Sequence, residues 1–425
     1  MAYAQAAGAV ARPSGPLLID LVRAKSQPLL AALVAIWIFS GGFVLAEPAP
    51  YELLFLAAVA VGLFAGFGLH RATLDLLLLF VLFVPFAFIG AFQGSAIPLT
   101  DALIFNVVTI FLVFTAYFVA NYVADDPAAR MQLIVRAYVA AALISAVVAT
   151  LGYLDLIPGS EMFTRYGRAK GFFKDPNVFA PFLIPPALYA LQRVLLGNRR
   201  QVIWGGIIFF AIFVGIFVSF SRAAWGIFAV GAVMVFALVF FLEANARQRL
   251  GMLIVAVTGV LVLGVALVGL LSIPAVSRLF EVRASGQSYD EGETGRFGRQ
   301  GYAFDLALQH PFGMGPLEFG RTSTVREEPH NTYVTVLHHY GWGGGLVFYG
   351  LVLLALWRGV RCLLVASPNR LVLIPLVCSF LPLAVEAAII DVDHWRHFFL
   401  LIGLIWGVTA NYAHAPPGGP RKVLL

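Results

Sequence analysis

The sequence predicts an all-α protein, a polytopic bundle of about twelve transmembrane helices with a long loop that contains short helices. Of its 425 residues, 60% are hydrophobic and 12% are charged, whereas a soluble domain carries roughly 25% charged residues. The apolar residues form blocks of about 20, the length that a helix needs to cross the hydrocarbon layer. A transmembrane β-barrel would instead show short segments of alternating polarity. The pattern therefore excludes both a soluble globule and a membrane barrel.

The twelve expected spans place both chain ends on one side of the membrane. Arg12, Arg23 and Lys25 precede the first apolar block and resemble the n-region of a signal peptide. That block is longer than a signal-peptide core and a second block follows at once, so we expect an uncleaved first span. The expected spans are 28–46, 51–69, 73–93, 101–122, 130–154, 176–194, 202–220, 223–243, 250–272, 330–357, 371–390 and 395–412.

The distribution of charge predicts the orientation of these spans. The segments on the side of the termini hold more than half of the 28 lysines and arginines and few of the 22 acids. Short basic loops stay in the cytoplasm, so we expect both termini there. The scatter of basic residues between spans also favours membrane lipids over nucleic acid as partner. The expected organisation is a cytoplasmic tail (1–27), nine spans (28–272), a periplasmic loop (273–329), three spans (330–412) and a second cytoplasmic tail (413–425).

Several basic residues lie on the opposite, outer face, against the usual retention of positive charge in the cytoplasm. Guanidinium groups hold anions through forked hydrogen bonds, so recurring outer arginines predict an anionic ligand. The alternative is ion pairing with nearby acids, namely Asp290, Glu291, Glu293, Glu327 and Glu328. The outer basic residues are Arg165, Arg168, Lys170, Lys174, Arg222, Arg278, Arg283, Arg296, Arg299, Arg321, Arg326 and Arg396.

The loop 273–329 is too long for a simple connection, and such loops are usually functional or disordered. It contains an acidic, Gly-rich stretch (285–295), a helical pattern (297–310) and the turn Pro311-Phe312-Gly313-Met314-Gly315. We expect partial order, with short helices between irregular segments.

The segment before span six combines cations with a helix start. Asp175 suits the N-cap position and Pro176 suits the first helical position. The backbone N–H groups of the helix would then face outward and favour an anion. The alternative is a capped helix whose interfacial cations bind lipid headgroups. The cations are Arg165, Arg168, Lys170 and Lys174, and Asn177 lies in the first turn.

Arg222 lies at the edge of span eight, directly after Ser221. A charged residue at the membrane edge is costly, which makes it a candidate functional residue. The alternative is that its side chain extends into the interface without a specific ligand.

His330 lies at the start of span ten, after Pro329. The proline marks a helix start, so we expect His330 in the first turn. The positive end of a helix disfavours imidazolium, and a neutral ring can act as general base on a hydroxyl. The alternative is a structural histidine that caps the loop. We expect packing roles for His338 and His339, and close helix packing at Gly341, Gly344 and Gly345.

The segment Asp391-Val392-Asp393-His394-Trp395-Arg396-His397 precedes span twelve. Two acids and two histidines allow a metal site, but no second cluster with ligand spacing supports one. We favour an interfacial anchor that supports the functional site. The chain has no Walker loop, no GxGxxG motif before a helix and no nucleophile-elbow serine, which argues against ATP hydrolysis.

Four of these segments together resemble the superfamily of bacterial O-antigen ligases and O-antigen polymerases. His330-Asn331 with Gly341 and Gly344 resembles the ligase signature. The pattern of the superfamily's periplasmic loop is similar to the stretch from Gly295-Arg296 through His310-Pro311 to Gly313-Met314-Gly315. Its Gly-Phe-Asp-Pro-Asn element resembles residues 170–177, and its Ser-Arg pair resembles Ser221-Arg222. Gly226 stands where the ligase pattern has leucine, which leaves ligase and polymerase both open.

The resemblance implies a multi-pass enzyme of the bacterial inner membrane with its active face in the periplasm. It implies glycan transfer from undecaprenyl pyrophosphate to an acceptor hydroxyl, on lipid A–core for a ligase or on another lipid-linked glycan for a polymerase, without metal or cofactor. We expect catalytic roles for His330 as base and for Arg222 and Arg296 on the diphosphate. A transporter, with Glu386 as its deep charge, and a non-catalytic scaffold are the other candidates. The expected substrate contacts are Arg168, Lys170, Lys174, Asn177, Arg299 and Asn331.

Overall fold

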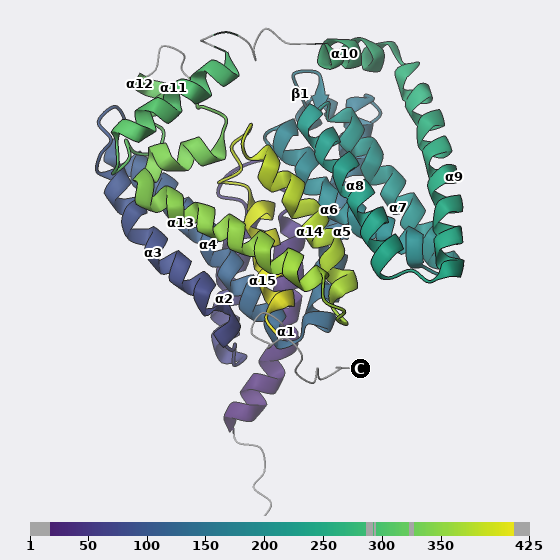
Figure 1. Cartoon of the computed structure of the whole chain (residues 1–425), viewed down its shortest axis with the longest axis horizontal. Coiled ribbons are helices and arrows are strands. Elements are labelled where there is room, and N and C mark those ends of the chain that lie inside the picture. Colours follow the sequence, from purple (N-terminus) through teal and green to yellow (C-terminus); the bar gives the residue numbers. More distant parts are fainter. Residues whose placement is uncertain (1–17, 286–291, 293–294, 323–326, 412–425) are drawn as a thin grey trace, which may run out of the picture.

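The computed structural model describes residues 18–285, 292, 295–322 and 327–411, which fold as an almost entirely helical bundle (Figure 1). Every expected span overlaps one of its long helices. These are α1 (Leu18–Ser40), α2 (Pro50–Phe64), α3 (Leu74–Ala91), α4 (Leu99–Asp125), α5 (Pro127–Tyr153), α6 (Pro176–Leu196), α7 (Arg199–Val218), α8 (Arg222–Leu242), α9 (Ala246–Leu271), α13 (Thr332–Leu363), α14 (Arg370–Glu386) and α15 (Arg396–Thr409).

Nine of the described helices are long and apolar enough to cross a membrane, and α2 and α15 are shorter apolar helices. With α14, which has 17 residues, they account for the twelve expected spans, so the predicted all-α membrane fold is confirmed. The main difference is α1, which begins at Leu18 and ends at Ser40 rather than covering 28–46. It ends early because Gly41 and Gly42 follow and Pro48 and Pro50 break the next stretch.

The smaller elements connect these helices. The expected helical pattern at 297–310 is α11, and the long loop holds two further short helices, as predicted. The small elements are the 3₁₀ turns η1 (Arg71–Thr73) and η2 (Ser160–Phe163), the strands β1 (Thr164–Arg165) and β2 (Arg168–Ala169), which pair as an antiparallel hairpin, and the helices α10 (Pro274–Ala284), α11 (Arg296–Gln309) and α12 (Phe319–Thr322).

Most of the small elements gather at one end of the bundle. The hairpin and α10 to α12 lie there, while α1 begins and α15 ends at the opposite end (Figure 1). We call the first the loop end and the second the terminal end. The start of α8 and the starts of α13 and α15 all face the loop end, so the sequence-predicted site residues lie on one side of the bundle.

Helix α15 lies at the centre of the bundle and α9 at its edge (Figure 1). Every residue of α15 from His397 to Thr409 is buried. Gly403 and Gly407 let α15 approach α4 closely, since a Cβ at either glycine would lie within 2.8 Å of an α4 carbonyl oxygen. By contrast, Met252 is the only buried residue described for α9. The residues at the loop end are therefore attached to a closely packed interior, with α15 at its centre.

Helix α13 is kinked at Gly341, where φ is 70° and ψ is −176°. Only glycine adopts this backbone region readily. The turn 311–315 fits against the kink, because Met314 N donates to His338 O at 2.7 Å and Trp342 N donates to Pro311 O at 2.9 Å. The kink thus attaches the long loop to the start of α13.

Replacing Gly341 by alanine is expected to lower the free energy of unfolding by about 1–3 kcal/mol. The new Cβ would also lie 2.4 Å from Pro311 O. Gly259→Ala in α9 is the matched control, because a Cβ there meets nothing within 4 Å and alanine is the better helix former. Thermal unfolding in detergent checks this: equal midpoints for the two variants would contradict the account of the kink.

Candidate functional site

His330 lies just outside α13 rather than in its first turn, which corrects the sequence-based expectation. The helix begins at Thr332, and Asn331 is its N-cap, with Oδ1 accepting from the backbone N–H of Tyr333 and of Val334. His330 therefore precedes the cap and has φ of 56°, a conformation uncommon for residues other than glycine. The difference arises because Asn331 is a stronger N-cap than the sequence argument allowed.

The His330 ring faces a carboxylate. Its Nδ1 lies 3.3 Å from Asp391 Oδ2, and the other carboxylate oxygen of Asp391 accepts from Thr335 Oγ1 at 2.9 Å. The side chains of His330 and Asp391 are 35% and 24% exposed, so the pair is accessible from solvent. A carboxylate at Nδ1 favours the tautomer whose Nε2 is free to accept a proton. A histidine paired in this way can take up a proton at Nε2.

Two backbone segments hold this pair together. Thr332 N donates to Ala387 O at 2.8 Å, and Thr332 Oγ1 donates to Ile390 O at 2.9 Å. Val392 N donates to Thr332 Oγ1 at 2.8 Å. The start of α13 and the segment joining α14 to α15 are therefore fixed to one another, although they are far apart in sequence.

Helix α11 lies against the same site. Gln300 Nε2 donates to His330 O at 2.9 Å, and Arg296 is one turn earlier on the same face of α11. Arg299 is buried and forms an ion pair with Glu327 at 2.8 Å. Arg299 is therefore paired with an acid of the chain, which was the alternative to binding an anionic ligand. The proposed partners Asp290, Glu291 and Glu293 lie outside the described residues.

A second group of predicted residues surrounds the start of α6. Arg168 is buried, and its guanidinium donates to Ser219 O at 2.8 Å and to Asn177 Oδ1 at 2.7 Å. Burial, and then the nearby charges of Arg283 and Arg222, lower the pKa of Arg168 to about 10. Arg168 therefore joins the start of α6 to the end of α7. Helix α8 begins three residues after Ser219 with the exposed Arg222.

The start of α6 has the predicted cap. Asp175 is the N-cap and accepts from Asn177 N at 2.7 Å, and Pro176 is the first helical residue. Since the carboxylate of Asp175 already occupies this helix end, the protein supplies an anion there itself. Nearby, Lys170 Nζ donates to Phe173 O at 3.1 Å.

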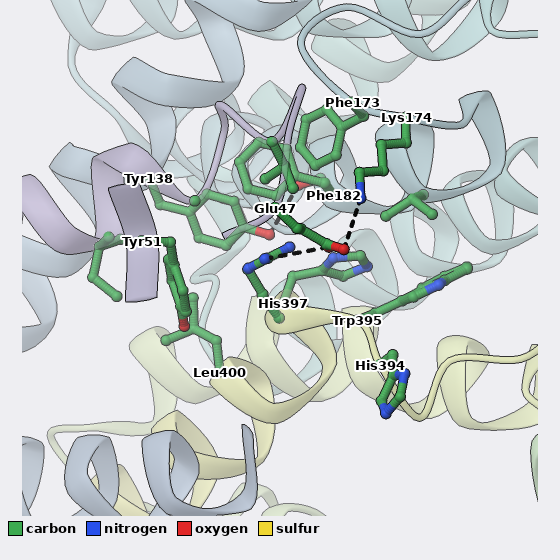
Figure 2. Close-up of a pocket in the computed structure, with 15 residues that line it drawn as sticks. Glu47, Tyr51, Tyr138, Phe173, Lys174, Phe182, His394, Trp395, His397 and Leu400 are labelled. Atoms are coloured by element: carbon green, nitrogen blue, oxygen red, sulfur yellow. Dashed lines mark hydrogen bonds and ion pairs between the residues drawn. The ribbon is translucent and has the colours of Figure 1, made fainter. Parts of the chain in front are cut away.

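Lys174 forms a third group, apart from the other two. Its Nζ pairs with Glu47 at 2.7 Å, and Arg396 pairs with the same Glu47 at 3.5 Å and with Glu52 at 2.5 Å. This network lies at a cavity of about 230 Å³ (Figure 2). A second, shallower groove of about 730 Å³ lies beside Gly167 and Arg278. Neither is lined by Arg222, Arg296 or His330.

Sequence reasoning missed several residues of the site. Gln300, which holds the backbone at His330, has no distinguishing pattern. The sequence shows Asp391 only as an acid in a mixed cluster, and the fold alone shows its partner, 61 positions away. Glu47 lies in no motif of the sequence. Glu386, the expected deep charge of a transporter, is the last residue of α14 at the loop end.

The fold and site define a polytopic membrane protein in which a histidine–aspartate pair and several arginines gather at one end of the bundle. Residues 207–349 match the family model described as O-antigen ligase, which supports the O-antigen ligase superfamily that the motifs resemble. The matched region includes Arg222, Arg296 and His330. It supports a membrane glycosyltransferase of ligase or polymerase type. No curated protein matches the chain.

Asn331 is expected to act as a helix cap rather than as a substrate ligand. Asn331→Ala should lower the free energy of unfolding by about 0.5–2 kcal/mol because two backbone N–H groups lose their acceptor. Asn331→Ser, which can still cap, should recover most of that loss in thermal unfolding. If alanine leaves the unfolding midpoint unchanged while both variants bind substrate poorly, a direct contact to substrate is the better account.

Proposed function

We propose that the protein transfers a glycan from undecaprenyl pyrophosphate to an acceptor hydroxyl at the periplasmic face of the bacterial inner membrane. The observation that carries this proposal is the His330–Asp391 pair beside α11. Lipid A–core is the proposed acceptor, as for a ligase. The alternative is a polymerase that joins two lipid-linked glycans, which the departure at Gly226 keeps open.

The base step follows from the pair. Asp391 holds Nδ1 of His330, so Nε2 takes the proton of the acceptor hydroxyl as its oxygen attacks the anomeric carbon. The new C–O bond forms while the bond from that carbon to the diphosphate oxygen breaks, and its electron pair leaves with the diphosphate. A single displacement of this kind inverts the anomeric configuration.

The arginines act on the leaving group. Negative charge grows on the diphosphate in the transition state, and fixed guanidinium groups stabilise it there more than in the ground state. Arg296 lies on the His330 side of the loop end and Arg222 at the start of α8, so we propose that the diphosphate lies between them. Arg168 supports Arg222 from a buried position, through Ser219 O at the end of α7. In this scheme the positive charge of the arginines neutralises the diphosphate, as a metal ion would do in other enzymes.

The orientation follows the positive-inside rule. The short loops at the terminal end are the basic ones, so we propose that they face the cytoplasm and that the loop end faces the periplasm. Glycan analysis of a strain lacking the gene separates the two acceptors. Long unattached chains indicate a missing ligase, whereas accumulated single repeats indicate a missing polymerase.

His330→Ala is expected to lower the turnover number for glycan transfer in proteoliposomes by about 10²–10⁴-fold, the usual contribution of a general base. His70→Ala is the matched control, because His70 forms another His–Asp pair, with Asp125 at 2.6 Å, between α2 and α3. That control should retain activity. A folded His330→Ala protein with undiminished turnover would remove the base from the mechanism.

Asp391→Asn is expected to lower the turnover number on the order of 10²-fold, with little change in KM, because the imidazole loses its orientation rather than its contact with substrate. The asparagine can still accept the hydrogen bond from Thr335. Steady-state kinetics with purified donor and acceptor measure the two constants separately. A rise in KM alone would mean that Asp391 binds substrate and does not position His330.

A further inference from the structure

The cavity beside Lys174 lies close to the proposed site but is lined by other residues. Its wall comes from α1, α2, α5, α6 and α15 and from the segments that precede α2, α6 and α15 (Figure 2). The segment joining α14 to α15 separates the two sites. It places Asp391 against His330, and four residues later Trp395 lines the cavity.

The rim of the cavity is formed by charged side chains that pair with one another. Glu47 accepts from both Lys174 and Arg396, and its side chain is 53% exposed, against 24% for Glu52. Burial raises the pKa of Glu47, but the hydrogen bond and charge of Lys174 and the charge of Arg396 outweigh this and lower it. Glu47 is therefore an ionised carboxylate between two cations, and because its side chain is 53% exposed, water screens both ion pairs. Another anion can take its place.

The interior of the cavity is mainly apolar and aromatic. Tyr138, Phe173 and Phe182 form one wall and Leu400 another (Figure 2). Two polar atoms break this lining: His397 and Tyr51 are 3% and 2% exposed, and neither His397 Nε2 nor the Tyr51 hydroxyl oxygen has a hydrogen-bond partner among the described residues. Buried polar atoms are normally paired, so these two atoms indicate an occupant that carries at least one polar group.

The volume of the cavity limits the occupant. At about 230 Å³ it is smaller than the roughly 300–1,000 Å³ of a pocket that encloses a whole drug-sized ligand. It can hold part of a hydrocarbon chain, with the headgroup left at the charged rim. Two cations beside an apolar interior at the loop end match an anionic lipid better than a soluble anion, which would gain nothing from the aromatic walls.

We propose that this cavity binds a phosphate-bearing lipid separate from the glycan donor. Its phosphate pairs with Lys174 and Arg396 in place of Glu47, and one hydrocarbon chain enters between the aromatic walls. In the proposed transfer the acceptor is itself attached to a lipid, so we assign the cavity to the acceptor lipid. That assignment rests on the proposed function, whereas the binding of the phosphate-bearing lipid does not.

The test measures lipid binding by native mass spectrometry of the full-length chain carrying His330→Ala, so that no transfer occurs. Dioctanoylphosphatidic acid and dioctanoylglycerol differ only in the phosphate, and farnesyl phosphate and farnesol form the matching isoprenoid pair. We expect the phosphate-bearing member of at least one pair to bind at least tenfold more tightly than its neutral counterpart, the effect of one charge-assisted hydrogen bond. Preference for the acyl pair indicates a glycerolipid or lipid A–type chain, and preference for the isoprenoid pair a polyprenyl chain.

Variants locate the binding. Glu47→Gln should tighten it several-fold because the competing carboxylate is gone, and Lys174→Gln should weaken it about tenfold. Val178→Trp, which fills the cavity, should abolish it. Arg165→Gln is the matched control, because Arg165 belongs to the same basic segment but does not line the cavity. Equal binding of phosphate and neutral lipids, or Glu47 and Lys174 variants that behave like the control, would overturn the proposal.

The two proposals fail separately. Equal binding of phosphate-bearing and neutral lipids, with glycan transfer intact in the protein that keeps His330, removes the lipid site only. Retained lipid preference in a protein that transfers no glycan removes the proposed function only.

Discussion

The structure depends on one constraint, the need to satisfy every backbone N–H and C=O group within hydrocarbon. Helices meet this need internally, so the chain crosses as helices and keeps its irregular backbone at their ends. The conspicuous exception is the kink at Gly341, and there the turn 311–315 supplies the missing partners. The longest irregular segments, which are the loop 273–329 and the hairpin, lie at the loop end. The candidate site residues lie there because they belong to these segments and to the helix starts beside them.

Charge at the loop end serves two purposes. Arg168 and Arg299 are buried and bound to other parts of the chain, so they hold helices and loops in place. Arg222 is exposed at a helix start. Desolvating a guanidinium is costly unless its hydrogen bonds are satisfied, which explains why the buried arginines have several acceptors or an acid. Arg168 and Arg299 thus hold parts of the chain together from buried positions, whereas Arg222 lies at the surface.

The sequence predicted most of the fold because the hydrophobic signal of a membrane span is local. Local chemistry also predicted the Asp175 cap and the helix 297–310. It failed where two local signals compete, since Pro329 and Asn331 both mark a helix start and only the structure shows that Asn331 is the cap. It could not find the partners of His330 or Lys174, because Asp391 and Glu47 come from distant segments. Pairing across the bundle is set by packing, which no short motif records.

The exposed position of helix α9 affects how its sequence can change during evolution. With almost all of its surface open to lipid, its residues are restrained by length and hydropathy but hardly by shape. Many apolar sequences would satisfy it equally, so substitutions there should accumulate freely. We therefore expect the likeness over residues 207–349 to reside mainly in the segments on either side of α9. Drift in this helix would hide kinship between related chains without altering what they do.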